Sequence, residues 1–438
     1  MAGRDPRPPR GATGVRDLRH PTVSRPRHRT GWPVAVALVA GAVVLGLELP
    51  RIEHAQHWRG GINFDPSTAQ AMLAAIAGGM MTLTGFVFTA VTLIIQTVQS
   101  QSPRLLRALD RTDRTPLLFG AFTATFTFAL VVLSRVRSNY VPNISVTLSL
   151  IFVLGSVSLF LRLIVTMRTA LTVGGLTRTI GDELRELIDA LYPNPYLVTP
   201  VPSVAEGKDY RETWAVRHQG PPGVFQSFDE VGVVRWAEKA DAEVAFVPAV
   251  GDFVVTGATV ALVTGPPPAE AAVAAQVQIG PVRTLEQDPA YGIRLLVDVA
   301  LRALSPAVND PTSVTQTLNQ LDDILQRLVG RSLGDGFLLD ASGRARVRYP
   351  APTWEAFLAL AVDEVRLFGA GNLQVARRLR ALLEDLLVIA PVPRKGPVQA
   401  RLDLLQLAVD RAFSHPADAA EAAVADRQGI GSARLSGP

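Results

Sequence analysis

Four long apolar stretches lie in the first 170 residues, at about 32–50, 68–100, 116–135 and 144–167. Each is almost free of internal charge and long enough to cross a hydrocarbon layer of roughly 30 Å as a helix. One such stretch alone could be a buried core helix. Four in succession predict a polytopic α-helical membrane protein with four transmembrane helices. Asp65-Pro66 favours a helix start, because Asp caps a first turn and Pro lacks an N–H that would go unused there.

The second stretch carries small and polar side chains on one helical face. It runs for about 31 residues, or about 46 Å of helix, so it should tilt or project beyond the bilayer core. With spacings that alternate between four and three, the stripe comprises Gly78, Thr82, Gly85, Thr89, Thr92, Gln96 and Gln99. It indicates either a seam for close helix packing or the lining of a polar pore or groove. A shorter stripe on the third stretch fits either interpretation: Gly120, Thr123, Thr127 and Ser134.

The distribution of arginines predicts the orientation. Residues 1–31 are rich in Pro and Arg, and we expect them to be disordered. The first 30 residues hold eight arginines and the loop after the second stretch holds four, whereas each of the two opposite loops holds two. Because arginine-rich loops stay inside, we expect a multi-pass protein of the plasma (inner) membrane with both termini in the cytoplasm. The four loop arginines favour contacts with anionic lipid headgroups or act only as a topology signal: Arg104, Arg107, Arg111 and Arg114.

After residue 168 the pattern becomes that of an α+β cytoplasmic region. An amphipathic helix at 176–191 leads into a small β-containing domain. Within it, 223–229 reads as a strand followed by a short helix, and three further strands lie at 244–247, 253–255 and 259–263. The run Val250-Gly251-Asp252-Phe253-Val254 resembles the entry turn of a barrel-sandwich hybrid, the fold of biotinyl and lipoyl carriers. The carrier lysine is missing, so the resemblance implies shape and no swinging arm.

From residue 280 the pattern is mainly helical. Helices are predicted from Asp288-Pro289 to about 304 and from Asp310-Pro311 to about 329, each with an Asp cap followed by Pro. A hairpin around Asp340 precedes four more helical patterns, at about 353–368, 372–390, 396–413 and 416–426. The polar residues of this region predict either a cytoplasmic polar cluster that binds a small anion or plain caps and salt bridges: Arg283, Asp288, Arg294, Asp298, Arg302 and Asp310.

The amino-acid composition excludes several classes of functional site. The chain is 48% apolar and 19% charged, and it has no cysteine, which excludes disulfides and thiolate chemistry. The net charge of +4 comes from the N-terminal tail, so the near-neutral remainder argues against a nucleic-acid partner. Nucleotide-binding, metalloprotease and hydrolase motifs are missing, and we expect no cofactor and no enzymatic activity. His54 and His57 have no third ligand nearby, so no metal site is predicted.

Two stretches together resemble the domain of unknown function 2254 family of bacterial predicted membrane proteins. One runs from Gly85-Phe-Val-Phe-Thr to Ser102-Pro103-Arg104, and the other from Arg283-Thr-Leu-Glu-Gln-Asp-Pro through Ala-Val-Asn-Asp310-Pro-Thr. The resemblance covers roughly residues 30–425. It implies an integral plasma-membrane protein without assigned activity and supplies no catalytic residues. Ala307 stands where glycine is expected.

Three functional hypotheses follow. The first is a homo-oligomeric channel- or transporter-like assembly in membrane lipids, because four spans alone enclose little polar volume. The second is a non-transporting sensor or scaffold whose cytoplasmic part binds a ligand or partner. The third, an enzyme acting on a lipid or small anion, has the least support. The expected organisation is a tail, a transmembrane domain, a β-containing domain, a helical domain and a loose end, at 1–31, 32–170, 171–265, 266–428 and 429–438.

Overall fold

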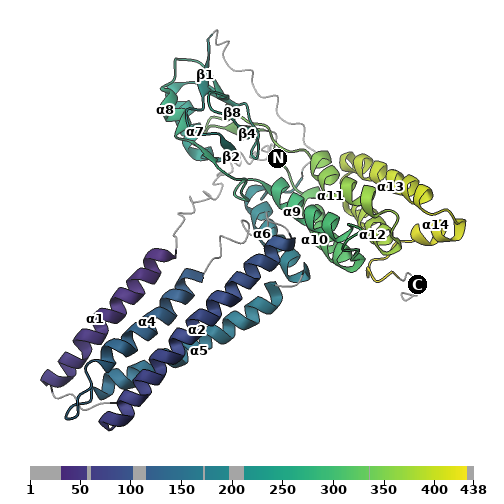
Figure 1. Cartoon of the computed structure of the whole chain (residues 1–438). Coiled ribbons are helices and arrows are strands. Elements are labelled where there is room, and N and C mark those ends of the chain that lie inside the picture. Colours follow the sequence, from purple (N-terminus) through teal and green to yellow (C-terminus); the bar gives the residue numbers. More distant parts are fainter. Residues whose placement is uncertain are drawn as a thin grey trace, which may run out of the picture.

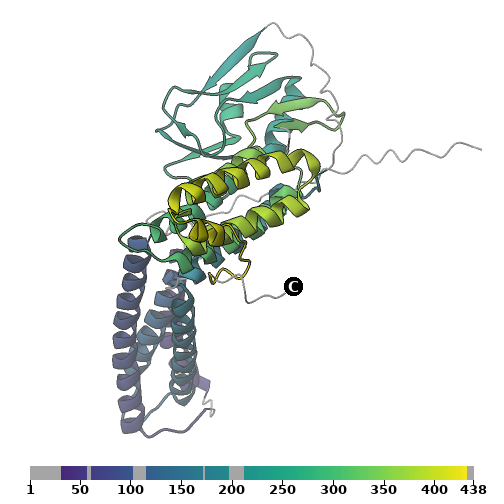
Figure 2. The ribbon, with the colours of Figure 1, turned by 90° about the vertical axis from the view of Figure 1, so that its right-hand side faces the viewer.

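The computed structural model describes residues 31–56, 61–101, 115–170, 173–196, 212–334 and 336–431. It has three parts: a bundle of long helices, a part made of two small sheets, and a second set of helices (Figure 1). The bundle and the β part lie at opposite ends of the view, with the second set of helices between them (Figure 2).

Four helices form the bundle, as the apolar stretches predict. They are α1 (Trp32–Gln56), α2 (Pro66–Gln101), α4 (Thr115–Leu133) and α5 (Asn143–Ala170). All four are long and apolar enough to cross a membrane. The bundle's near end is the end at which α5 leads towards α6 (Val173–Leu191), and its far end is the opposite one.

Helix α4 lies at the centre of the bundle and packs against α1, α2 and α5. Gly120 allows the closest approach, since a Cβ there would lie 2.6 Å from the Cα of Ala35 on α1. The apolar face of α2 meets α4 through Leu73 and Val87, which are fully buried. Thr125 and Ser156 share a 3.0 Å hydrogen bond between α4 and α5. Small residues therefore bring the backbones together, and hydroxyl groups link them.

Within the residues that the structure describes, the β part contains eight strands in two sheets. They are β1 (Thr213–Arg217), β2 (Gly223–Phe228), β3 (Glu243–Phe246), β4 (Phe253–Val254), β5 (Thr259–Thr264), β6 (Val277–Gly280), β7 (Phe337–Leu339) and β8 (Ala345–Arg348). One sheet has the order β1-β5-β3-β8-β7 and the other β4-β2-β6, with α7 (Glu230–Ala240) and α8 (Glu270–Ala274) beside them. Phe225, Phe228 and Phe246 form the centre of their shared core. The turn at Gly251 has φ +97°, a conformation that favours glycine.

The second set of helices consists of α6 with six later helices. These are α9 (Pro289–Ala303), α10 (Pro311–Val329), α11 (Trp354–Gly369), α12 (Leu373–Ile389), α13 (Val392–Ala412) and α14 (Pro416–Ala422). Asp288 accepts a hydrogen bond from the Tyr291 N–H at 2.9 Å, and Asp310 accepts one from the Ser313 N–H at 3.0 Å. Both caps are thus as the Asp-Pro pattern predicts.

The units that pack together do not follow the boundaries expected at residues 171 and 265. Helix α6 packs against α9 and α10, so it belongs with the later helices. Strands β6, β7 and β8 come after residue 265 yet complete the two sheets, and β8 pairs in parallel with β3. The β part is therefore built from two separated pieces of the chain.

Acid is expected to loosen the β7–β8 hairpin through Asp340. Burial opposes its ionisation, but hydrogen bonds from Ser342, Arg346 and the Arg344 N–H outweigh burial and lower the pKa of Asp340 to about 2. The Arg346 Nε lies 2.8 Å from the carboxylate. A pKa below that of the unfolded chain contributes stability above about pH 4, roughly 2 kcal/mol, which is lost as the pH falls towards 2. Hydrogen–deuterium exchange of residues 337–348 in the full-length protein measures the loss.

The Asp340→Asn variant should lower the protection of this hairpin near neutral pH and remove most of its change between about pH 4 and pH 2. Asp418→Asn, an exposed aspartate on α14, is the matched control and should follow the unmodified protein. Parallel pH profiles for Asp340→Asn and the unmodified protein would contradict the prediction.

Candidate functional site

The stripe on α2 faces out of its own bundle. Gly78, Thr82, Gly85, Thr89 and Gln96 are all exposed, and Thr92 is half-buried. A Cβ added at Gly78 or Gly85 would meet nothing within 4 Å in the described chain. The stripe is therefore not a packing seam against α4 and α5, because that contact uses the opposite, apolar face.

The threonines of the stripe satisfy their hydroxyl groups within α2. Thr82 donates to the Gly78 carbonyl at 3.0 Å, and Thr89 donates to the Gly85 carbonyl at 3.1 Å. Thr92 donates to the Phe88 carbonyl at 2.9 Å. This pairing lets the threonines face an apolar surrounding, and their oxygens keep a lone pair for a further donor.

Some predicted residues lie outside the described part of the chain. These are Arg104, Arg107, Arg111 and Arg114, together with His57 and the side chain of Gln99. His54 packs its ring against Tyr140, with centroids 4.6 Å apart. Among the described residues, no group of three or more His, Asp or Glu is placed to hold a metal ion. On the third span, Gly120 is buried against α1, Thr123 and Thr127 are half-buried, and Ser134 is exposed.

The predicted polar cluster divides into separate ion pairs and a cap. Arg283 binds Asp288, with 3.1 Å between Nη2 and Oδ1, and its guanidinium lies 5.5 Å from the Tyr291 ring centroid. A Cβ at Gly251 would clash with that guanidinium, so the Arg283 pair joins the β part to the start of α9. The ordinary roles of cap and salt bridge account for Asp288 and Arg283.

The second ion pair lies further along α9. Arg294 binds Asp298 at 2.6 Å and also Glu364 on α11 at 3.1 Å. Its hydrogen bond lowers the pKa of Glu364 and raises its own pKa. Arg302 is exposed at the end of α9, and Asp310 caps α10. Hydrogen bonds from Ser313 lower the pKa of Asp310.

An open cleft lies between α6 and α10, immediately after the last helix of the bundle. Its volume is about 670 Å³. Its lining contains Gly174, Gly175, Thr177, Arg178, Arg185, Gln316, Asn319, Gln320, Asp323 and Arg327. Gly174 permits the close approach of the two helices, since a Cβ there would lie 2.7 Å from Gln316 Oε1. The lining of the cleft is mainly polar.

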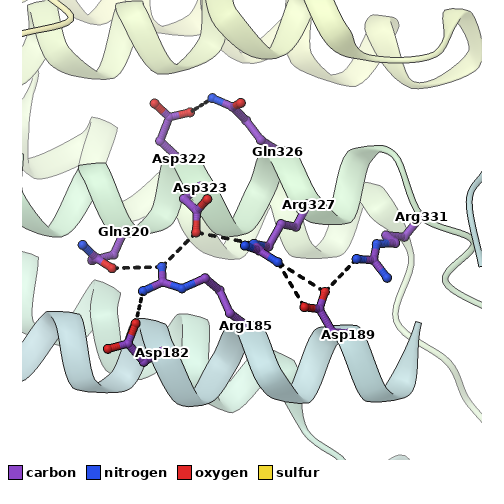
Figure 3. Close-up of polar contacts among 9 residues, drawn as sticks. All are labelled: Asp182, Arg185, Asp189, Gln320, Asp322, Asp323, Gln326, Arg327 and Arg331. Atoms are coloured by element: carbon purple, nitrogen blue, oxygen red, sulfur yellow. Dashed lines mark hydrogen bonds and ion pairs between the residues drawn. The ribbon is translucent and has the colours of Figure 1, made fainter. Parts of the chain in front are cut away.

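Alternating charges connect α6 to α10 (Figure 3). Some of these side chains also line the cleft. Arg185 on α6 binds Asp323 at 2.8 Å and Gln320 at 3.2 Å, and it also contacts Asp182. Burial lowers the pKa of Arg185, but the hydrogen bonds to Asp182 and Asp323 raise it more, so the group stays charged.

A second group of ion pairs continues the connection towards the end of α6 (Figure 3). Asp189 accepts from Arg327 at 3.1 Å and from Arg331 at 2.7 Å. Arg331 also donates to the Tyr192 carbonyl at 2.7 Å. Because α6 follows α5 in the chain and contacts it, these pairs connect a membrane-crossing helix to α10. We call them the α6–α10 ion-pair network: Asp182, Arg185, Asp189, Asp323, Arg327 and Arg331.

These features define a class: a membrane protein with four transmembrane helices followed by a mixed α/β region with helices. The chain belongs to the family described as predicted membrane protein (DUF2254), whose model matches residues 28–385. It is 28% identical over 380 residues to the uncharacterized protein MT1328 of Mycobacterium tuberculosis strain CDC 1551, covering 81% of this chain and 71% of that protein. The uncharacterized proteins Mb1321c of Mycobacterium bovis and Rv1290c of M. tuberculosis strain H37Rv match to the same extent. No solved structure matches the chain.

Proposed function

We propose that this protein forms a homo-oligomeric conduit of the plasma membrane, in which the α2 stripes of several copies face a shared axis. The observation that carries the proposal is the direction of the stripe, which points away from the bundle's own helices. Residues 173–431 then lie in the cytoplasm with both termini, as the arginine distribution favours.

The composition of the stripe favours helix neighbours over lipid. A face that only meets lipid gains most from large apolar side chains, as at Met81 and Phe88, which are 67% and 63% exposed. The stripe has glycine and threonine instead, at a repeat of 3.5 residues that keeps one face towards a partner helix. Small side chains also let helices approach closely. An α2 helix from another copy is the partner that this pattern fits.

The same stripe supports a polar path. Its threonine and glutamine side chains are neutral, so the conduit would not hold a charge relay of the kind used in proton-coupled pumps. Residues 173–431 supply the parts that assemble and gate it, since α6 follows α5 and is tied to α10 by the α6–α10 ion-pair network. The barrel-sandwich shape of the β part stays a prediction.

The test is flux through the purified full-length protein in liposomes. Leucine at Thr89, Thr92 and Gln96 together should reduce ion or small-solute flux at least about tenfold, since it replaces polar groups with apolar ones along the path. The matched control is the triple change Met81→Leu, Phe86→Leu and Phe88→Leu, which alters exposed apolar positions of the same helix and should keep the flux.

Oligomerisation is tested separately, with cysteines introduced into a chain that has none. Thr82→Cys should form a disulfide between copies in the membrane, whereas Leu154→Cys, on the exposed face of α5, should not. Equal cross-linking at both positions would contradict the shared axis. A reconstituted protein that passes no ion or small solute would contradict the conduit.

A second candidate is a non-transporting membrane sensor or scaffold, and the cleft between α6 and α10 favours it. The cleft lies where a bound ligand would contact the helix that follows α5. This candidate predicts ligand binding without flux, so the liposome assay separates it from the conduit.

A further inference from the structure

We propose that the cleft between α6 and α10 binds a phosphate-bearing anion beside the membrane. The inference deepens the second candidate function and also applies to a gated conduit. Its basis is a polar hollow whose lining combines three guanidinium groups with one carboxylate, next to the near end of the bundle. The three are those of Arg178, Arg185 and Arg327.

Acidic side chains compensate two of the three arginines. Arg185 pairs with Asp182 and Asp323. Arg327 pairs with Asp189 and lies 3.6 Å from Asp323. Arg178 is exposed in the cleft and forms no hydrogen bond or ion pair with any residue in the part of the chain that the structure describes. The lining thus presents an uncompensated guanidinium, and guanidinium groups bind phosphate oxygens in paired hydrogen bonds.

Arg327 adds a donor that is only partly used. Its buried Nε lies 3.6 Å from the Asp323 carboxylate, which is an ion pair but too long for a hydrogen bond, and its Nη1 binds Asp189. A buried donor without an acceptor costs free energy, and an anion in the cleft would supply the acceptor. Arg327 is therefore charged, held in place by Asp189 and still able to donate.

The backbone at the start of α6 also favours an anion in the cleft. The first turn of α6 begins at Val173, contains Gly174 and Gly175, and has no acidic residue. Amide groups at a helix N-terminus carry partial positive charge, which favours an anion nearby. The side-chain amides of Gln316 and Asn319 lie in the same lining. Such donors suit a phosphate group.

The volume of the cleft fits a phosphate ester better than a bare phosphate ion. A volume of about 670 Å³ falls in the range of roughly 300–1,000 Å³ typical of small-molecule sites. A soluble phosphate ester and the headgroup of an anionic phospholipid share the chemistry that the cleft recognises, and the position beside the bundle gives access to both.

Binding by the full-length protein tests the proposal in two arms. In nanodiscs of phosphatidylcholine, inorganic pyrophosphate is titrated by calorimetry. In nanodiscs with about 30% phosphatidylglycerol, hydrogen–deuterium exchange of residues 173–191 and 311–329 reports headgroup binding. Arg178→Gln should weaken either interaction about tenfold, because it removes a charged donor and leaves the α6–α10 ion-pair network intact. Arg302→Gln, an exposed arginine on α9, removes the same charge elsewhere and should change affinity less than about twofold.

The pattern of results identifies the source of the phosphate. Pyrophosphate binding that Arg178→Gln weakens supports a soluble phosphate compound as the ligand. Protection that needs phosphatidylglycerol and is lost in Arg178→Gln supports a lipid headgroup. Absence of both effects, or an equal effect of Arg178→Gln and Arg302→Gln, overturns the proposal. Flux is measured separately, so a conduit that fails and a cleft that fails are told apart.

Discussion

Replacing Arg394 with methionine is expected to destabilise the junction of α10, α13 and the segment after α6 by about 3–4 kcal/mol. Arg394 is 7% exposed, and its Nη1 lies 2.9 Å from the carbonyl oxygens of Leu328, Val329 and Arg331. The Leu328 carbonyl also accepts from the Arg331 N–H at 3.1 Å, whereas Val329 ends α10 and Arg331 lies just beyond it, where intrahelical donors run out. Methionine keeps most of the side chain's apolar bulk and removes the charged donor that the three carbonyls share.

Aromatic rings cover the other sides of this guanidinium. Its Cζ lies 4.1 Å from the centroid of the Tyr196 ring and 5.8 Å from that of Trp354. Burial lowers the pKa of Arg394, yet the guanidinium stays protonated at neutral pH because its ordinary pKa exceeds 12. A charged donor in an apolar surrounding makes stronger hydrogen bonds than a neutral one. The loss should therefore exceed that of an ordinary surface arginine.

Hydrogen–deuterium exchange of backbone amides measures stability at this junction separately from the rest of the chain. The N–H groups of Tyr196 and Ser332 bind across this junction, to the carbonyls of Gly330 and Asn194. Both should lose protection in Arg394→Met. Lys395→Met, at the next position of α13, is the matched control and should cost less than about 0.5 kcal/mol. Equal protection in the two variants would refute the role given to Arg394.

Local signals in the sequence identify most of the helices. The Asp-Pro pairs place the starts of α9 and α10 correctly because a cap depends only on residues within one turn. The four membrane helices follow from composition alone. The start of α13 at Val392 precedes the predicted 396, since Pro393 lies in the first turn, where a proline does not interrupt a helix.

Contacts between distant segments are not visible in the same way. Residues 244–247 and the hairpin around Asp340 were both predictable as strands, but their parallel pairing joins positions about a hundred residues apart, and alternation carries no information about partners. Strands β1 and β6 are short, and their patterns do not distinguish them from loops. The β part is consequently larger and less continuous than the pattern indicates.

The candidate sites also depend on contacts between distant segments, which the sequence pattern does not reveal. The repeat of small residues on α2 places the stripe on one face, but only the buried Leu73 and Val87 show that this face is the outer one. In α6 the charges at Asp182, Arg185 and Asp189 have helical spacing, which fits an exposed face equally well. Their partners on α10 and just after it lie 135 residues or more further along the chain. The cleft was therefore absent from the sequence prediction.

Glu53 is a further residue that the pattern did not reveal, and its loss is expected to destabilise the bundle by about 2–4 kcal/mol. The first apolar stretch ends near residue 50, but α1 continues to Gln56. Glu53 is 4% exposed there and reaches the start of α5. Its carboxylate accepts from the Ile144 N–H at 3.1 Å and the Ser145 N–H at 2.9 Å, as well as from the Ser145 hydroxyl.

A carboxylate at this position serves as a cap supplied by another helix. The first N–H groups of α5 have no partner within the helix, and their partial positive charge favours an anion. Other contacts hold the same far end, since Asn143 accepts from the Phe64 N–H at 3.0 Å and Tyr140 donates to the Pro50 carbonyl at 2.9 Å. Glu53 thus joins the first and last helices of the bundle.

The Glu53→Ala variant should unfold at lower denaturant in mixed detergent micelles, and the amides of Ile144 and Ser145 should exchange faster. Glu53→Gln keeps an acceptor oxygen and loses the charge, so it should recover about half of the stability. Glu48→Ala is the matched control on the same helix, because Glu48 forms an exposed pair with Arg51 whose contribution is at most about 1 kcal/mol. If Glu53→Ala and Glu48→Ala unfold alike, the carboxylate does not cap α5, and the connection between α1 and α5 depends on Tyr140 and the packing of the helices instead.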